Sequence, residues 1–273
     1  MTKLQLEAAV TTHVGRVRTN NEDNFYLYGR IREDVSTDFA QFACTAPAKA
    51  FLAAVCDGMG GESCGERASL IGVQALRPAR LGQIREAALE SISRANERIC
   101  NEMEQNSIGR MGSTFAAIYM DEDKAVACNV GDSRIYLWRD GALRLLSVEH
   151  SKAAHLVRMG VLTPEQAARH PSRHVLTQHL GIFPHEMELE PAFSEELELR
   201  AGDCLLVCSD GLTDMVPEEN IVRTLREGQS AEKTAQMLQE LALENGGRDN
   251  VTVLIVRVSE RPGLWQRLMG GAR

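Results

Sequence analysis

Acidic residues that end apolar runs and lie next to glycine are the most constraining feature of this sequence. Asp57 and Asp210 each end an apolar run and are each followed by glycine. Asp249 lies in a glycine loop that precedes the last apolar run, 251–258. A buried strand that delivers a carboxylate to a loop where the backbone can approach closely is suited to holding a cation or a phosphate. The pattern therefore predicts one site, assembled by the fold from three strand ends far apart in the sequence.

Composition and charge narrow the class of protein. At 273 residues, with 44% hydrophobic and 25% charged side chains, the chain can build the core of one globular domain. Its net charge of -8 argues against a broad surface for nucleic acid or anionic membranes. No run approaches the roughly 18 apolar residues of a transmembrane helix, and the N-terminus lacks a signal-peptide core. We therefore expect a cytoplasmic protein that binds neither nucleic acid nor membrane.

The seven cysteines are odd in number and show no metal-ligand spacing. Cys56, Cys128, Cys204 and Cys208 lie within apolar runs that are typical of strands. Free cysteine is commonly buried in protein cores, so we interpret these residues as reduced core side chains and not as disulfides or zinc ligands.

Hydrophobic periodicity predicts strands in runs and helices in pairs. The predicted strands are 4–14, 24–31, 51–56, 113–120, 124–130, 134–138, 203–209 and 250–258. The predicted helices are 66–76, 83–105, 217–226 and a fourth that Ser230 caps and that ends at Gly246 and Gly247. Because strands and helices do not alternate regularly, the pattern indicates antiparallel sheets with helices packed on them and excludes a Rossmann-type fold.

Two segments are expected to lie outside this framework. Residues 33–49 show no clear periodicity and are predicted to form a surface loop. Residues 147–191 are rich in histidine, have a short helical pattern at 163–168 and are predicted to form an inserted flap. The chain is thus predicted to be one domain over 1–260 that contains the flap, followed by a short tail over 261–273. Gly131 and Asp132 are predicted to turn a hairpin.

Six acids lie at predicted strand ends or in tight loops: Glu22, Asp23, Asp57, Asp132, Asp210 and Asp249. If several converged, their repulsion would raise their pKa values, and a bound cation would relieve it. All are oxygen donors, which favours Mg2+ or Mn2+. Two such ions could share a carboxylate and a water, lower the pKa of that water and present hydroxide to a phosphoryl group.

The same chemistry needs a cation that orients the phosphate. Arg18, beside Glu22 and Asp23, could donate two hydrogen bonds to phosphate oxygens, and Arg16 is the weaker candidate. Taken alone, however, the stretch 15–23 is typical of a solvated hairpin loop.

Six motifs appear in the order found in a known enzyme family. They are 18–23, 55–61, 112–114, 129–134, 208–212 and 247–252. Together they resemble the metal-dependent protein phosphatases of the PP2C type over about 14–256, and the glycines after Asp57 look most like the bacterial branch, which opposes Ser/Thr protein kinases. The resemblance implies an α+β fold, with a central antiparallel β-sandwich flanked by helices and a metal centre in a cleft at one end.

The resemblance also implies roles for the matched acids. Asp57 would bridge two Mn2+ or Mg2+ ions, and the Gly58 carbonyl would bind one of them. Asp210 and Asp249 would ligate the other ion. A third, weaker metal would be held by Asp132 together with Asp210.

Four further residues complete the implied site. Glu22, with Asp23 beside it in a direct or water-mediated role, would complete the metal centre. Arg18 would hold the substrate phosphate, and Asn250 would fix the loop that carries Asp249.

The sequence departs from the family pattern after the first acid–glycine pair. Animal relatives carry there a histidine proposed as a general acid, whereas this chain has Met59. The leaving group would then take its proton from metal-bound water or from elsewhere. His150, His155 and His174 are the candidates in the flap, unless they are ordinary surface residues.

These residues predict a metal-dependent hydrolase of phosphoserine and phosphothreonine in proteins. The expected partners are phosphorylated proteins, among them a Ser/Thr protein kinase, and a monomer is the expected state. The main alternative is a pseudo-phosphatase that keeps the fold and binds phosphoproteins as a regulatory module. A second is the sporulation-type branch that acts on phosphorylated anti-sigma antagonists, but Arg18 fits the kinase-opposing branch better.

Overall fold

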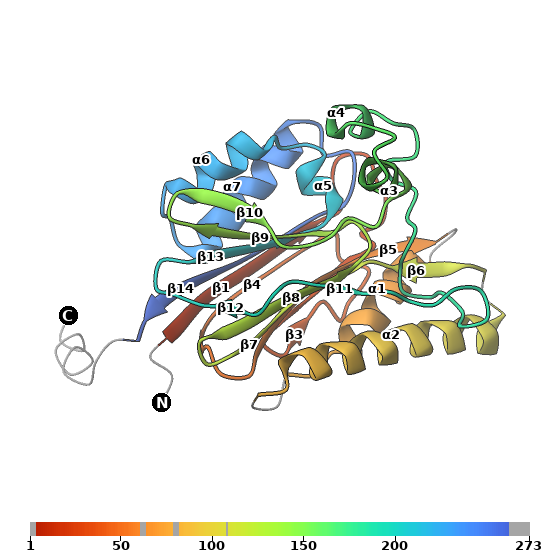
Figure 1. The fold of residues 1–273 in the computed structure, drawn as a ribbon, viewed down its shortest axis with the longest axis horizontal. Coiled ribbons are helices and arrows are strands. Elements are labelled where there is room, and N and C mark those ends of the chain that lie inside the picture. Colours follow the sequence, from red (N-terminus) through yellow and green to blue (C-terminus); the bar gives the residue numbers. More distant parts are fainter. Residues whose placement is uncertain (1–3, 61–63, 79–81, 108, 262–273) are drawn as a thin grey trace.

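The computed structural model describes residues 4–60, 64–78, 82–107 and 109–261. Its strands form two antiparallel sheets that face one another (Figure 1). The first sheet contains β1 (Leu4–His13), β4 (Phe39–Pro47), β9 (Arg134–Arg139), β10 (Ala142–Leu145), β13 (Cys204–Cys208) and β14 (Val251–Glu260). The second contains β2 (Asp23–Leu27), β3 (Arg30–Ile31), β5 (Phe51–Gly60), β6 (Met111–Ser113), β7 (Phe115–Asp121), β8 (Lys124–Val130), β11 (Ala192–Phe193) and β12 (Leu197–Glu198).

The strand order brings the two ends of the chain together. The first sheet runs β10-β9-β13-β14-β1-β4, so the last strand pairs with the first over their full lengths. The second runs β11-β8-β7-β5-β2-β3, with β12 beside β8 and β6 beside β5. Most of the predicted acids lie in or beside four strands: β13 and β14 in the first sheet, and β2 and β5 in the second.

Side chains alternate between two cores along the central strands, as the period of a strand requires. In β5, Phe51 and Val55 point into the layer between the two sheets, while Leu52 and Cys56 point to the opposite face. This alternation explains why 51–56 reads as a continuous apolar run: both faces of the strand are covered.

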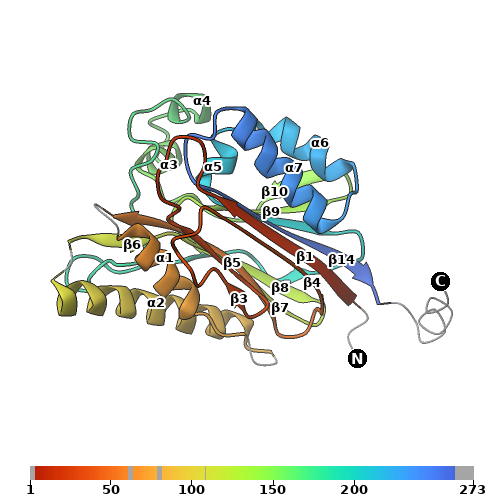
Figure 2. The same cartoon turned by 180° about the vertical axis from the view of Figure 1, so that it is seen from behind.

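Helices cover the outer face of each sheet (Figures 1 and 2). On the second sheet lie α1 (Gly65–Gln74) and α2 (Ile84–Asn106). On the first lie α5 (Asp210–Thr213), α6 (Glu218–Arg226) and α7 (Ala231–Glu244). The apolar stripe from Ile84 to Met103 is buried on α2, and the Ser230 hydroxyl accepts a hydrogen bond from the Lys233 amide to cap α7. The four-layer α+β sandwich is confirmed.

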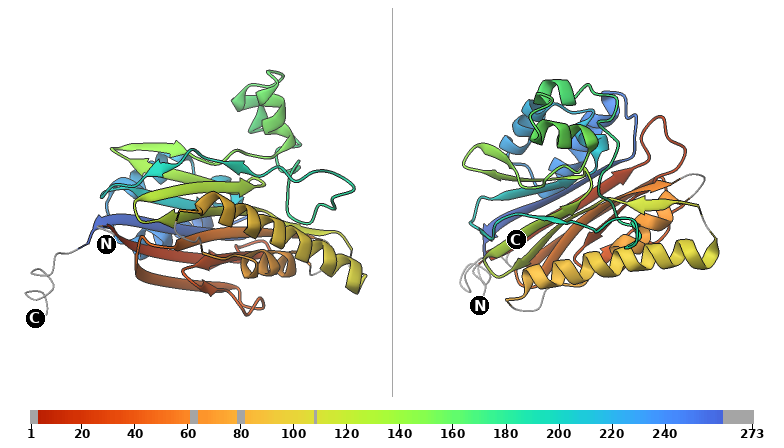
Figure 3. Two further views of the ribbon diagram at one scale, coloured as in Figure 1. Left: turned by 60° about the horizontal axis from the view of Figure 1, so that its bottom comes forward. Right: turned by 45° about the vertical axis from the view of Figure 1, so that its right-hand side comes forward.

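Only the first part of the predicted flap stands out from the body of the sandwich (Figure 3), because Leu180 is buried in the same core as α2. The flap carries α3 (Lys152–Arg158) and α4 (Pro164–Ala167). The short helix expected at 163–168 is confirmed as α4, which begins with a capping box between Thr163 and Gln166. Helix α3 was not predicted, because its seven residues are too few to show a periodic stripe.

Three predictions of local structure were wrong. The strand expected over 24–31 is two strands, β2 and β3, which are joined by a turn at Tyr28 and Gly29 and pair with one another. The segment 33–49 is not all loop, because it contains β4, the edge strand beside β1. Its side chains are mostly exposed or half-exposed, and its alanines hide the alternation that marks a strand. Gly131 and Asp132 do not turn a hairpin: β8 and β9 belong to different sheets, so this link crosses the end of the sandwich.

Other expectations concern the chain as a whole. Apart from Arg261, the predicted tail over 261–273 lies outside the described residues. Among the helices that the structure describes, none combines the length and the hydropathy that a bilayer crossing needs. Cys56, Cys128, Cys204 and Cys208 are buried free thiols, as predicted.

Candidate metal and phosphate site

The predicted acids meet in a cleft at one end of the sandwich. Asp23 begins β2 and lies directly opposite Asp57 of β5 in the ladder between the two strands. Asp210 follows β13, and Asp249 precedes β14. These two strands are neighbours in the first sheet, whereas β2 and β5 belong to the second. The cleft has a volume of about 530 Å³, and its lining includes Arg18, Glu22, Asp57, Gly58, Asp132, His174, Asp210, Asp249 and Asn250.

Asp23 lies buried beneath this cleft. Its Oδ2 accepts hydrogen bonds from Ser209 Oγ at 2.8 Å and from Thr252 Oγ1 at 2.7 Å. Its Oδ1 is buried and has no hydrogen-bond partner. Burial raises the pKa of Asp23 to about 7, and the two hydroxyl hydrogen bonds oppose that rise. A buried carboxylate oxygen without a donor is unfavourable unless a cation or a water lies close by.

Asp57 is held through its backbone by Thr114, which sequence reasoning had not assigned to the site. The Asp57 amide donates to Thr114 Oγ1 at 2.9 Å, and the Thr114 amide donates to the Asp57 carbonyl at 2.8 Å. Thr114 Oγ1 also shares a hydrogen bond of 2.7 Å with Ser133 Oγ. This pair of hydroxyls therefore joins β5 to the crossing link between the sheets.

The carboxylates raise one another's proton affinity. Burial, followed by the charges of Asp23, Asp210 and Asp132, places the pKa of Asp57 well above its usual value. Burial also raises the pKa of Glu22. Because the donors are oxygens, and because Glu22, Asp57 and Asp132 form no ion pair within the described part of the chain, the site fits a hard cation such as Mg2+ or Mn2+.

The loop around Gly58 leaves no room for a side chain. A Cβ at Gly58 would lie 2.0 Å from the Gly65 carbonyl oxygen and 2.7 Å from the Glu22 carbonyl oxygen. The Gly58 amide donates to that Glu22 carbonyl at 3.1 Å. Glycine at 58 is thus what lets the Glu22 loop and the start of α1 close around the end of β5.

Asn250 joins the N-terminal loop to the Asp249 loop. Its Nδ2 donates to the carbonyl oxygens of Val14 and Asn20, both at 2.9 Å. Its Oδ1 accepts from the Glu22 amide at 2.7 Å. One side-chain amide therefore bonds three backbone groups of the loop that carries Arg18 and Glu22.

Arg18 stands at the edge of the cleft. Its Nη2 donates to Asp249 Oδ2 at 2.8 Å, and its side chain is 52% exposed. The hydrogen bond to Asp249 raises the pKa of Arg18, so the guanidinium stays charged. Arg16 instead donates from Nε to the Leu243 carbonyl and is not among the residues that line the cleft.

The three flap histidines occupy different environments. His150 is buried, and its Nδ1 accepts from the Gly131 amide at 3.2 Å, so it stabilises the crossing link. His155 is exposed on α3 and does not line the cleft. His174 lines the cleft, with Nδ1 3.4 Å from Asp210 Oδ2. Only His174 of the three therefore reaches the predicted site.

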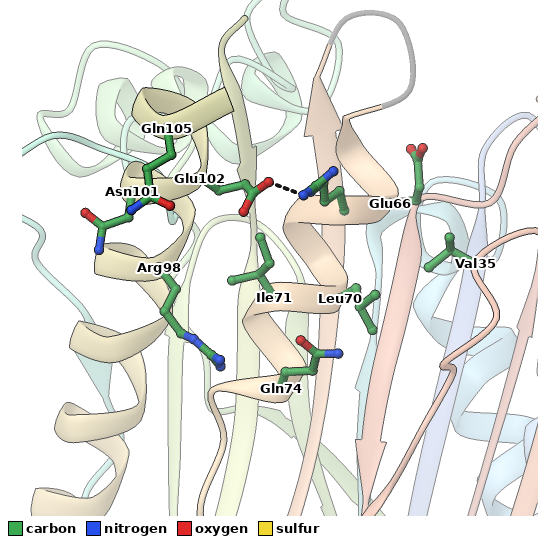
Figure 4. Close-up of a pocket in the computed structure, with 10 residues that line it drawn as sticks. Val35, Glu66, Leu70, Ile71, Gln74, Arg98, Asn101, Glu102 and Gln105 are labelled. Carbon is green, nitrogen blue, oxygen red and sulfur yellow. Dashed lines mark ion pairs between the residues drawn. The ribbon is translucent and has the colours of Figure 1, made fainter. Parts of the chain in front are cut away.

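A second pocket of about 620 Å³ lies between α1 and α2 (Figure 4). Arg98 of α2 and Gln74 of α1 line it, and Arg67 of α1 forms an ion pair with Glu102 of α2 across it. None of the predicted site residues lines this pocket. Its lining balances two arginines with two glutamates, whereas the lining of the cleft gathers six acids. The cleft is therefore the candidate site.

Comparison with known proteins decides the family. The family model described as protein phosphatase 2C matches residues 29–244. The chain belongs to the protein phosphatase 2C family. The described fold and the cleft of acids at the end of its sandwich accord with that membership.

Named members of the family are similar over almost the whole chain. The serine/threonine protein phosphatase PstP of Mycobacterium tuberculosis is 36% identical over 98% of the chain, although the match spans only 48% of PstP. The serine/threonine phosphatase Stp of Listeria monocytogenes is 32% identical, with 92% of this chain and 95% of Stp covered. The crystal structure of the PstP catalytic domain in complex with two manganese ions is similar with a TM-score of 0.77 at 33% identity, covering 94% of this chain and 100% of that one.

Proposed function

We propose that this chain is a metal-dependent protein serine/threonine phosphatase that acts on phosphorylated proteins. The observation that carries the proposal is the cleft itself, in which half-buried carboxylates from both sheets converge and Arg18 lies at the edge. The named relatives with this fold are serine/threonine phosphatases, and one of them was crystallised with two manganese ions.

We propose that two Mn2+ or Mg2+ ions bind among the acids. Asp57, which lies at the centre of the cluster, would bridge them, and the Gly58 carbonyl would bind one ion. Asp210 and Asp249 would bind the other ion. When bound, such ions neutralise phosphate charge and lower the pKa of a coordinated water.

We assign two further acids to the same centre. Glu22 lies in the loop that Asn250 fixes and would complete the metal centre. Asp23 would support the centre from below through its Oδ1, which has no hydrogen-bond partner. Asp132 and Asp210 would hold a third, weaker ion, since their ligand atoms lie within 4.8 Å of one another.

The remaining roles belong to residues that position the substrate. Arg18 has the exposure and the charge to bind two phosphate oxygens at the mouth of the cleft. Asn250 would keep that arginine and Glu22 in register with Asp249. Met59 has no proton to donate, so the leaving oxygen takes its proton from water or from another group.

We further propose the cellular setting. A Ser/Thr protein kinase is the expected partner, because the motif that follows Asp57 resembles the branch of the family that opposes such kinases. Buried free thiols such as Cys56 and Cys208 suit a reducing compartment such as the cytoplasm. The chain is expected to act as a monomer.

The alternative of a pseudo-phosphatase is less well supported. Such a protein would be expected to have lost part of the metal centre, whereas every predicted acid is present at the cleft or, in the case of Asp23, directly beneath it.

Hydrolysis of para-nitrophenyl phosphate and of a phosphothreonine peptide tests the proposal. The wild type and Asp210→Asn would be compared with Mn2+, with Mg2+ and with EDTA. We expect metal-dependent turnover that the substitution nearly abolishes. A folded protein that binds Mn2+ but shows no turnover in any condition would support the pseudo-phosphatase instead.

A further inference from the structure

We propose that His174 of the flap is a nitrogen ligand of the third metal ion, together with Asp132 and Asp210. This inference rests on the proposed function, in which Asp132 and Asp210 hold that ion. It adds two properties that an all-oxygen site lacks: a preference for transition metals such as Mn2+ over Mg2+, and a metal-dependent bond between the flap and the body of the enzyme.

The geometry brings one ligand atom from each of three elements together. Asp132 lies in the link that crosses between the sheets, Asp210 begins α5, and His174 lies in the flap. One ligand atom of each lies within 4.8 Å of the others.

The orientation of the imidazole suits ligation through Nδ1. Nδ1 lies 3.4 Å from Asp210 Oδ2, on the side of the acids, while Nε2 lies 3.3 Å from Asp214 Oδ2. A metal-bound histidine commonly donates its other ring N–H to a carboxylate, which fixes the tautomer and the ring. Asp214 lies one helical turn after Asp210 and is placed to be that acceptor.

Arg173 sets a condition on this tautomer. Its Nε lies 2.6 Å from His174 Nε2, where it donates if that nitrogen is unprotonated. Ligation through Nδ1 places the proton on Nε2, so Arg173 must then turn its Nε away. Asp214 provides the alternative partner, because Arg173 Nη2 already contacts its carboxylate at 3.2 Å.

The donor type determines which metals the site prefers. Mg2+ binds oxygen almost exclusively and keeps several waters, whereas transition metals accept imidazole nitrogen readily. The two ions proposed at Asp57 have oxygen ligands only. The third site would therefore be the one place in the cleft where Mn2+ and Mg2+ are distinguished by a nitrogen donor.

The same bond would tie down the flap. The segment that carries His174 is bonded to the start of α3, because the Lys152 amide donates to the Val175 carbonyl at 2.8 Å. An ion that joins His174 to Asp132 and Asp210 thus connects α3 with both sheets. Asp132, His174 and Asp210 line a groove of about 640 Å³ together with residues of α3 and α4.

Electron spin echo envelope modulation of bound Mn2+ tests the ligand directly. Nitrogen-14 modulation from an imidazole is expected in the wild type at saturating Mn2+, and it should disappear in His174→Asn. The matched control is His155→Asn, which removes an exposed histidine of the same flap and should keep the modulation. Modulation that persists in His174→Asn, or that is absent from the saturated wild type, would overturn the assignment.

Equilibrium dialysis with metal analysis supplies a second readout. The wild type should bind one more Mn2+ ion than Mg2+ ion at equal free metal, and His174→Asn should lose that difference. Asp214→Asn should weaken the third Mn2+ ion by about tenfold, the usual effect of removing a carboxylate behind a metal-bound histidine. Two bound Mn2+ ions without nitrogen modulation would overturn this inference alone, whereas a wild type that binds no Mn2+ would overturn the proposed function as well.

Discussion

Arg18 Nη2 lies 2.8 Å from Asp249 Oδ2, so the proposed phosphate-binding cation contacts a proposed metal ligand. The contact keeps the guanidinium at the mouth of the cleft without burying it. The Arg18 side chain can then reach both Asp249 and a bound phosphate. Hydrogen bonds between such charged groups are stronger than those between neutral groups.

Arg18→Ala is expected to raise KM for a phosphopeptide by about tenfold or more while changing kcat less, because hydrogen bonds to charged groups are worth about 1.5–3 kcal/mol. Steady-state kinetics at saturating Mn2+ measures both constants. Arg16→Ala is the control, since Arg16 bonds the Leu243 carbonyl outside the cleft and should leave KM near the wild-type value. An unchanged KM in Arg18→Ala would remove Arg18 from phosphate binding.

Asp57→Asn is expected to nearly abolish turnover without destabilising the metal-free protein. The substitution removes a negative charge that burial and four other acids disfavour, and it keeps the side-chain shape. Thermal unfolding in EDTA should give a Tm equal to or above that of the wild type. A fall in Tm together with the loss of activity would mean that Asp57 acts mainly in the fold.

The stability of the metal-free protein should fall as pH rises between about 4 and about 7. Asp23 and Asp132 both have pKa values raised to about 7 in the folded state, against an ordinary value of 3.8. The folded state therefore binds more protons than the unfolded state across this window, which makes the slope of stability against pH negative. Denaturant titrations in EDTA at pH 5 and pH 8 measure the slope.

Saturating Mn2+ should reduce or reverse this dependence, because metal binding replaces the protons and strengthens as the carboxyls ionise. Asp23→Asn should make the slope shallower in EDTA. A stability that rises from pH 5 to pH 8 without metal would contradict the raised pKa values.

Thr114→Val is expected to lower the free energy of unfolding by about 1–3 kcal/mol, the usual penalty for leaving buried polar groups unpaired. The hydroxyl accepts from the Asp57 amide and bonds Ser133, and both partners would lose it. Thr114→Ser keeps the hydroxyl and is the matched control. Urea unfolding of the two variants compares them directly, and equal stabilities would show that the hydroxyl pair is dispensable.

Sequence reasoning found the acids because most of them lie where an apolar run begins or ends, a signal that survives without knowledge of the fold. The long helix α2 was equally accessible, since its stripe repeats over 23 residues. The hydroxyls of Thr114, Ser209 and Thr252 were not assigned, although they lie inside or next to the quoted motifs. Their roles depend on which strands become neighbours, and a single sequence does not show that.

The wrong predictions have similar causes. Strand β4 is an edge strand with alanine and cysteine at half-exposed positions, so its alternation is not one of polar and apolar residues. Gly131, in the link between β8 and β9, has a φ of +103°. A hairpin turn and a crossing between sheets can both use such a glycine, so its presence does not distinguish them. His174 could not be placed in the cleft because the flap has no periodic pattern that fixes its position.

The pairing of β14 with β1 over ten residues, from Leu4 opposite Glu260 to His13 opposite Val251, has a consequence for biosynthesis. A nascent chain that has emerged from the ribosome only as far as β13 lacks Asp249, Asn250 and the central strand of its first sheet. It cannot assemble the metal centre, however well its earlier segments have folded. Enzyme activity should therefore begin only when nearly the whole domain has been released, so incomplete translation products would be inactive.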